Sequence, residues 1–146
     1  MKNSPEQIIE IEYLLRKISG IIKRKGREIL NDFPITPPQF VALQWLNEDG
    51  DMTIGELSNK MYLAFSTTTD LVDRMEKNGL VERVRDLKDR RVVQIHLLNK
   101  GKEIIDEVLE ARRDYLTQIL ENMNHDDVNK MAVSLQQLFE KMDEGI

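Results

Sequence analysis

The sequence contains no cysteine among its 146 residues. It therefore has no disulfide framework and no thiol that could serve as a redox switch. Histidine is almost as scarce, because only His96 and His125 are present and neither has neighbours at metal-ligand spacing. We interpret His96 as an outward-facing strand residue and His125 as a helix-start residue. No metal site and no cofactor are expected.

Long apolar runs and a glycine-rich phosphate loop are also lacking. No segment approaches the roughly 18 uninterrupted apolar residues of a membrane span. The first residues carry no apolar run behind a basic start, so we expect a cytoplasmic protein with no membrane partner. Without a cysteine nucleophile, a phosphate loop or a histidine–carboxylate pair at catalytic spacing, the chain is not expected to be an enzyme.

The chain does have two consecutive helix signals near its middle. Thr53 and Glu56 have the spacing of a capping box, and apolar residues at helical spacing carry this first helix to about Met61. The connector that follows, Tyr62 to Phe65, has a length typical of a helix-turn-helix. The second helix of such a motif presents its N-terminal residues to the major groove of DNA.

The second helix is expected to start at a run of four hydroxyl residues and to stop at Asn78-Gly79. Ser66 is the expected N-cap, and the hydroxyls of the run can donate to phosphates or base edges. We expect Thr68 to read bases and to have little effect on stability. The residues of this helix that are predicted to contact DNA are Ser66, Thr67, Thr68, Thr69, Asp70 and Arg74.

Two strands with a basic turn between them follow the helix pair. Residues 80–85 and 92–98 are predicted strands, and apolar and polar residues alternate in the second of them. The turn between the strands carries Lys88, Arg90 and Arg91. Two helices followed by a hairpin with a cationic tip form the element order of a winged helix-turn-helix. The alternative is a small structural α/β module with a solvated charged turn.

Charge is divided unevenly along the chain, whose net charge of −5 is unusual for a DNA-binding protein. Residues 81–102 hold seven basic and three acidic side chains, whereas residues 103–146 hold four basic and eleven acidic ones. Attraction to phosphates depends on charge within a Debye length of about 8–10 Å, so the local excess matters more than the total. We expect the basic segment to face DNA and the acidic segment to face away from it.

Both ends of the chain carry narrow apolar seams. Ser4, Pro5 and Gln7 open a first helix with a capping box, and Asn124 is the expected cap of a last helix. Apolar residues then recur at alternating spacings of three and four, the pattern of a helix packed against partner helices. The seam residues are Ile8, Ile11, Leu15, Ile18 and Ile22 in the first helix, and Val128, Met131, Leu135, Leu138 and Met142 in the last.

These seams predict a homodimer, because one small winged helix cannot bury so many narrow apolar faces. The expected fold is mainly α with a small β-hairpin wing. A winged helix-turn-helix at residues 35–99 adjoins a helical dimerisation region formed by residues 1–34 and 100–146. A helix from about Pro37 to Asn47 precedes the DNA-binding pair. The alternative is an intramolecular bundle in a monomer.

Several segments together resemble the MarR (multiple antibiotic resistance regulator) family. The most specific is LVDRMEKNGLV at residues 71–81, followed by DRR at residues 89–91. TPPQF at residues 36–40 resembles the family's helix before the DNA-binding pair, and LLNKG at residues 97–101 resembles its junction after the wing. The departure is Leu98, which stands where the family has a capping threonine. We therefore expect Asn99 to cap the following helix instead.

The resemblance implies a transcriptional regulator that binds double-stranded DNA as a homodimer, acting as a repressor on a pseudo-palindromic operator. It also implies that Asp89 pairs with Arg91 in the wing and that Arg91 enters the minor groove. Lys88 and Arg90 are expected to contact phosphates close by. The competing hypothesis is a winged-helix module that binds proteins and does not bind DNA.

The resemblance further implies a small aromatic or lipophilic anionic effector that releases DNA. Arg16 and Trp45 are the matching positions, and Arg16 could pair with a carboxylate of such a ligand. The alternative is that Arg16 is solvated and that Trp45 belongs to the core.

Overall fold

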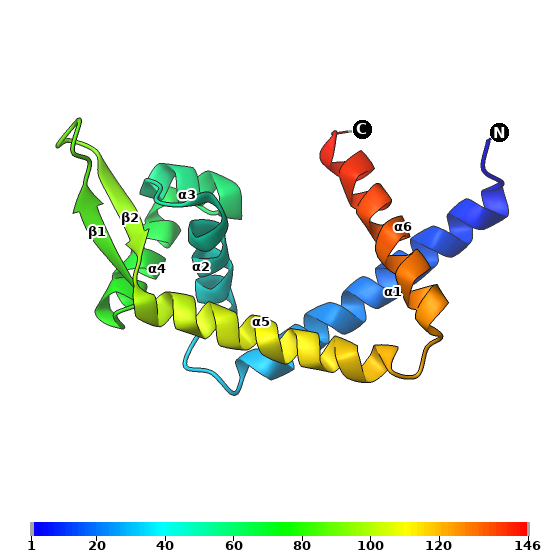
Figure 1. Ribbon diagram of the computed structural model, residues 1–146. Coiled ribbons are helices and arrows are strands. Elements are labelled where there is room, and N and C mark those ends of the chain that lie inside the picture. The colour runs from blue at the N-terminus through cyan, green and yellow to red at the C-terminus, as the bar shows by residue number, and fades with distance from the viewer. Residues whose placement is uncertain (1, 146) are drawn as a thin grey trace. The chain divides into compact units, whose positions relative to one another are not determined.

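The computed structural model describes residues 2–145, and within them the chain forms six helices and one two-stranded hairpin (Figure 1). In chain order the elements are α1 (Pro5–Leu30), α2 (Pro37–Asp49), α3 (Ile54–Met61), α4 (Phe65–Lys77), β1 (Val81–Arg85), β2 (Val93–Leu97), α5 (Asn99–Leu120) and α6 (His125–Asp143). The predicted fold class, mainly helical with a small hairpin, is confirmed. The chain divides into two units, one reaching Leu109 and the other beginning at Glu110, so α5 contributes to both.

The first two helices begin with complete capping boxes. At α1 the Ser4 hydroxyl accepts from the Gln7 amide at 3.2 Å, and the Gln7 side chain accepts from the Ser4 amide at 3.0 Å. Thr36 and Gln39 form the same pair of bonds at the start of α2. Each box satisfies amides that a helix N-terminus otherwise leaves without a partner. The box predicted at Ser4 is confirmed, and α2 runs beyond the expected Asn47.

The helix-turn-helix forms where the sequence predicts it, but its second helix begins earlier than expected. Thr53 caps α3 by accepting from the Glu56 amide at 3.1 Å. The predicted capping box is only half formed, because the Glu56 carboxylate accepts from the Thr53 hydroxyl and not from its backbone amide. The helix ends at Met61, and its C-cap Tyr62 has a φ of 56°, in the left-handed region. α4 starts soon afterwards, with Ala64 at the N-cap position and no side-chain cap. The prediction that Ser66 is the N-cap is wrong, because Ser66 is already helical and a capping residue needs an extended backbone.

β1 and β2 form an antiparallel hairpin in which Arg83 lies opposite Ile95. The Ile95 amide donates to the Met52 carbonyl at 2.7 Å, so the segment before α3 is bridged to the hairpin. His96 is exposed, as expected, and its Nδ1 lies 2.8 Å from Asp51. The core of the winged helix lies among α2, α3, α4, the hairpin and the first turns of α5. Its fully buried large apolar side chains are Phe40, Leu43, Leu57, Val72, Met75, Leu80, Val81, Ile95, Ile105 and Val108.

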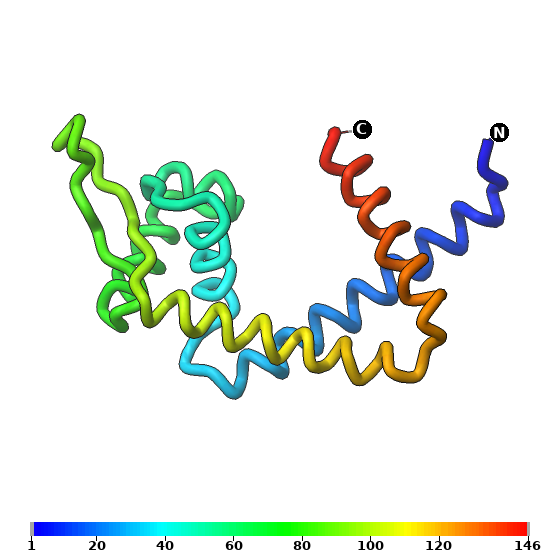
Figure 2. Tube along the Cα trace, in the orientation of Figure 1, coloured from blue at the N-terminus to red at the C-terminus, as the bar shows by residue number. Residues whose placement is uncertain are grey.

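The hairpin leads directly into the first turn of α5 (Figure 2). The Leu98 amide donates to the Leu80 carbonyl at 3.0 Å, and the Leu98 carbonyl accepts from the Lys102 amide at 3.1 Å. Leu98 therefore occupies the position before the first helical residue, which is Asn99. The prediction that Asn99 caps this helix is wrong, because the backbone of Leu98 is hydrogen-bonded on both sides and α5 already includes Asn99.

α1 and α6 belong to different units, and each leaves apolar side chains exposed. In α1 only Gly26, Ile29 and Leu30 are buried, all near its C-terminal end. α6 is capped by Asn124, as predicted, and has no buried residue in its described length. None of the helices among residues 2–145 combines the length and hydropathy that crossing a membrane requires.

Candidate DNA-binding site

The outward face of α4 gathers most of the helix residues that the sequence predicts to contact DNA. Val72 and Met75 are fully buried and define the inner face of the helix. On α4, Asp70 and Arg74 are each two positions from Val72 and lie on the opposite side of the helix, because i and i+2 do not share a helix face. The exposed polar residues on the outward side are Ser66, Thr67, Asp70 and Arg74. Hydroxyl, carboxylate and guanidinium groups on one helix surface can bind both phosphates and base edges.

Thr68 does not belong to this surface. Its side chain is 0% exposed, and its hydroxyl donates to the Ala64 carbonyl at 3.1 Å. Thr69 donates in the same way to the Phe65 carbonyl at 3.0 Å and is half-buried. The prediction that Thr68 reads bases is wrong, because a buried hydroxyl with a backbone partner is part of the core.

Two exposed aromatic side chains at the turn were missed by the sequence prediction, which placed both in a connector. Phe65 is the first residue of α4 and is 62% exposed, and Tyr62 is 94% exposed. A left-handed backbone costs a residue such as Tyr62 about 1–2 kcal/mol. Phe65 lies next to Ser66 at the helix start, where an apolar ring can contact the methyl group of thymine. The sequence feature that could have indicated this contact is the aromatic residue Phe65 directly before the hydroxyl run.

Arg83 on β1 joins the hairpin to α4. Its guanidinium donates to Asp73 at 2.6 Å and to Glu76 at 2.7 Å, and its backbone amide donates to Glu76 at 3.0 Å. Partial burial lowers the pKa of Arg83, but hydrogen bonds from the guanidinium to the two carboxylates outweigh this and raise it. In the sequence, Arg83 is one of the seven basic residues of residues 81–102 and has no nearby feature that marks it as a link to α4. Its partners lie ten and seven positions away, and the turn at Gly79 brings them together.

The tip of the hairpin holds the predicted acid–arginine pair. Arg91 donates from Nε to Asp89 Oδ1 at 3.1 Å and from a terminal nitrogen to Oδ2 at 3.2 Å. The Arg91 side-chain hydrogen bond, and then the Arg91 backbone amide, lower the pKa of Asp89. The Arg91 side chain is 90% exposed. Lys88 and Arg90 are also exposed, so the tip presents three cations with one of them already oriented.

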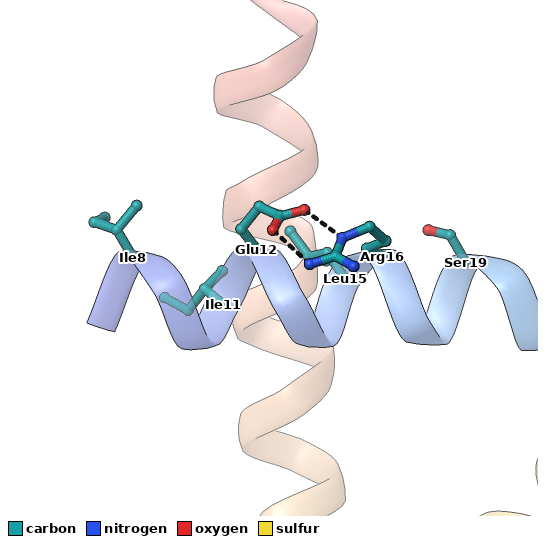
Figure 3. Close-up of a pocket in the computed structure, with 6 residues that line it drawn as sticks. All are labelled: Ile8, Ile11, Glu12, Leu15, Arg16 and Ser19. Carbon is teal, nitrogen blue, oxygen red and sulfur yellow. Dashed lines mark hydrogen bonds and ion pairs between the residues drawn. The ribbon is translucent and has the colours of Figure 1, made fainter. Parts of the chain in front are cut away.

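The two residues predicted for an effector lie in different surroundings. Arg16 binds Glu12 through two hydrogen bonds of 3.0 and 3.1 Å, which lower the pKa of Glu12 and raise that of Arg16. Glu12 and Arg16 line a hollow of about 430 Å³ on α1, together with Ile8 and Leu15. Figure 3 shows these side chains and the two hydrogen bonds of the pair. Trp45 is half-buried on α2, and the Lys60 ammonium lies 4.9 Å from its ring centre. Trp45 is not among the residues that line the hollow beside Arg16.

A helix-turn-helix joined to a cation-tipped hairpin defines a winged helix-turn-helix protein. Residues 35–93 match the model of the MarR family. The chain is 59% identical to the HTH-type transcriptional regulator YsmB of Bacillus subtilis over 137 residues, 94% of each protein. It is similar to the solved structure of a MarR family protein from Bacillus stearothermophilus, with 54% identity and a TM-score of 0.89 over 97% of this chain and 99% of that one. It is also 26% identical to the HTH-type transcriptional repressor MdtR of Bacillus subtilis, over 90% of this chain and 85% of that protein.

This chain belongs to the MarR family of transcriptional regulators, and the resemblance noted in the sequence is confirmed.

Proposed function

We propose that this protein represses transcription by binding a pseudo-palindromic DNA operator as a homodimer in the cytoplasm. α4 occupies the major groove of each half-site, and the hairpin reaches the neighbouring minor groove. The observation that carries the proposal is the link made by Arg83, which fixes the hairpin to α4 through Asp73 and Glu76. Because α4 and the hairpin are fixed to each other, they can contact a major groove and the adjacent minor groove at the same time. The name of the relative MdtR, a transcriptional repressor, supports repression.

In this proposal the wing supplies groove insertion and phosphate binding. Arg91 enters the minor groove, because a guanidinium is weakly hydrated and is attracted by the enhanced negative potential there. Asp89 holds that guanidinium in place, as its two hydrogen bonds to Arg91 indicate. Lys88 and Arg90 contact phosphates on either side.

The helix supplies the major-groove contacts. Ser66 and Thr67 lie in the first turn of α4, where exposed hydroxyls and free backbone amides reach phosphates and base edges. Arg74 lies two turns further along the same outward face and is suited to a guanine edge or a phosphate. Phe65 is added to the predicted set as an apolar contact to a thymine methyl group.

We propose that residues 1–34 and 100–146 form the dimerisation region, with a second copy of the chain as the occupant of the exposed seams. In a single chain Ile11 and Ile18 of the α1 seam are about half exposed, at 51% and 50%. A two-fold dimer buries such a seam and sets the two recognition helices to read half-sites about one helical turn apart.

We further propose that a small lipophilic anion binding at the α1 hollow weakens DNA binding. The hollow is apolar apart from Glu12, Arg16 and Ser19, and it includes residues of the proposed dimer seam. A carboxylate ligand that takes Glu12's place on Arg16 therefore changes the packing on which half-site spacing depends. Naphthoate, used as the probe, should release bound DNA from the wild type and fail to do so from Arg16→Gln. Equal release from both proteins would remove Arg16 from the proposal.

The central proposal is tested by selecting duplexes from a random library with the full-length protein. We expect enrichment of a pseudo-palindrome with half-sites about 10 base pairs apart. The mass of the complex in solution should correspond to two chains for each duplex. A protein that binds no duplex, or that enriches no sequence, would contradict the proposal and favour a protein-binding module.

A further inference from the structure

α4 carries three acidic residues on the helix proposed to enter the major groove. Two of them, Asp73 and Glu76, bind Arg83 and thereby hold the hairpin. The third, Asp70, has no hydrogen bond or ion pair from its side chain anywhere in residues 2–145. An exposed carboxylate without a partner is unfavourable close to DNA phosphates, since like charges repel. Its presence on this surface needs a physical reason.

The position of Asp70 is suited to base reading. It lies two residues from the buried Thr68 and two from the buried Val72, so it points away from the core. It is one helical turn beyond Ser66 and borders a hollow of about 460 Å³ that Thr67 and Arg74 also line. The carboxylate therefore lies between the hydroxyls of the first turn and the guanidinium of the next.

A carboxylate is an acceptor only, and this limits which base edge it can bind. In the major groove, guanine presents two acceptors and thymine presents an acceptor and a methyl group. Adenine offers an amino donor, but its N7 acceptor lies beside that donor and repels the second carboxylate oxygen. Cytosine offers its N4 amino group with no acceptor of its own at that edge.

We propose that Asp70 accepts a hydrogen bond from the N4 amino group of a cytosine in each half-site, and that it sets base preference there. The inference rests on the proposed function and assigns one base of the operator to one side chain. The repulsion between Asp70 and the phosphates then contributes to discrimination, because it is offset only on sequences that place an amino group opposite the carboxylate.

The test repeats the random-duplex selection with wild type, Asp70→Asn and the control Glu82→Gln. Glu82 is an exposed acid of β1, so the control removes the same charge from the same DNA-binding region without touching α4. Wild type and Glu82→Gln should enrich cytosine at one position of each half-site. Asp70→Asn should lose that preference and shift toward adenine, because an asparagine amide pairs with adenine N6 and N7.

The size of the base preference is measured from the affinities for operator duplexes with a single base pair replaced. Replacing that cytosine by thymine should weaken wild-type binding about tenfold and Asp70→Asn binding less than about twofold. The melting temperature of Asp70→Asn should equal that of the wild type, since the side chain is exposed and has no partner among residues 2–145.

Three results separate the possible failures. Equal tightening of Asp70→Asn on all sequences, matching Glu82→Gln, would overturn the inference and make Asp70 a repulsive bystander. Loss of a guanine preference that Arg74→Ala also loses would overturn it in favour of Asp70 positioning Arg74, which lies four residues along the helix. A wild type that enriches no sequence would overturn the proposed function itself.

Discussion

The winged helix and the terminal helices of this chain use apolar residues in opposite ways. In the winged helix Leu43 and Val72 are each 0% exposed. Ile18 in α1 is 50% exposed and Met142 in α6 is 66% exposed, although each belongs to a seam of apolar residues at alternating spacings of three and four. The first region completes its core within one chain. The terminal helices have the apolar pattern of a core, but their seams stay exposed in the single chain. We therefore propose that another copy of the chain packs against them.

The first prediction concerns the seam of α1, where the largest effect is expected. Ile18→Asp places a charge in a surface that is open in one chain and packed in the proposed dimer. An unpaired buried charge costs several kcal/mol, so the dimer should dissociate and operator binding should be lost. Light scattering at micromolar concentration should give a mass near 17.1 kDa for the variant and twice that for the wild type.

Lys17→Gln is the matched control for this variant. It makes the same change in net charge at the adjacent position, which points away from the seam. The control should remain a dimer and bind the operator normally. A wild type with the mass of a single chain would show that the exposed seams have another use.

The second prediction compares one substitution in the two regions. Gly101 lies where α5 leaves the wing, and a Cβ there would come within 2.6 Å of the Leu80 carbonyl oxygen and 2.8 Å of the Leu97 side chain. Gly101→Ala should therefore destabilise the protein by about 1–3 kcal/mol, as overpacking does. A Cβ at Gly20 in α1 would meet no atom within 4 Å among residues 2–145, apart from the neighbouring backbone of its own helix. Gly20→Ala should raise stability by up to about 1 kcal/mol through helix propensity.

Denaturant unfolding of both alanine variants measures this difference. Opposite signs would show that the winged helix is tightly packed in the single chain while this face of α1 is open. Destabilisation by Gly20→Ala would instead indicate that a partner helix passes close to Gly20.

The third prediction concerns the wing tip. Arg91→Ala should weaken operator binding by about 1–3 kcal/mol. Asp89→Ala should also weaken it, although it removes a negative charge beside DNA, because Arg91 then loses the carboxylate that orients it. Operator titrations of the two variants measure both effects. Tighter binding by Asp89→Ala would show that the acid only repels phosphates.

The pH dependence of this pair follows from the lowered pKa of Asp89. A carboxylate with a lowered pKa keeps its interaction above the usual value near 3.9 and loses it only as the pH falls through the lowered value. Breaking the pair should therefore make no contribution to any loss of operator binding between pH 7 and pH 5.

Local sequence patterns predicted the features that depend on nearby residues. The capping box at Ser4, the caps at Thr53 and Asn124 and the helix stop at Asn78-Gly79 are all set within a few positions of the chain. The pairing of Asp89 with Arg91 spans two positions and was implied by the family resemblance.

Features that depend on burial or on distant partners were missed. Ser66 and Thr68 carry the same hydroxyl chemistry, and only the packing of α4 decides that one is exposed and the other is in the core. The role of Arg83 needs the turn after α4 to bring it to Asp73 and Glu76, which spacing alone does not reveal.

The smallest predicted effect is on the salt dependence of DNA binding, which should respond to a lysine of the wing and not to a lysine of the terminal helices. Lys88 is exposed in the hairpin tip, and one lysine–phosphate contact contributes about one unit to the slope of log K against log salt concentration. Lys88→Ala should therefore reduce that slope by about 1 and should change affinity by a similar factor on operator and random DNA. Lys130→Ala removes an exposed cation from α6, in the acidic part of the chain, and should leave the slope unchanged. Equal slopes for Lys88→Ala and the wild type would place the wing lysine away from the phosphates. A reduced slope for Lys130→Ala would mean that the acidic terminal region also contacts DNA. The assignment of DNA binding to the winged helix and of dimerisation to the terminal helices would then be wrong.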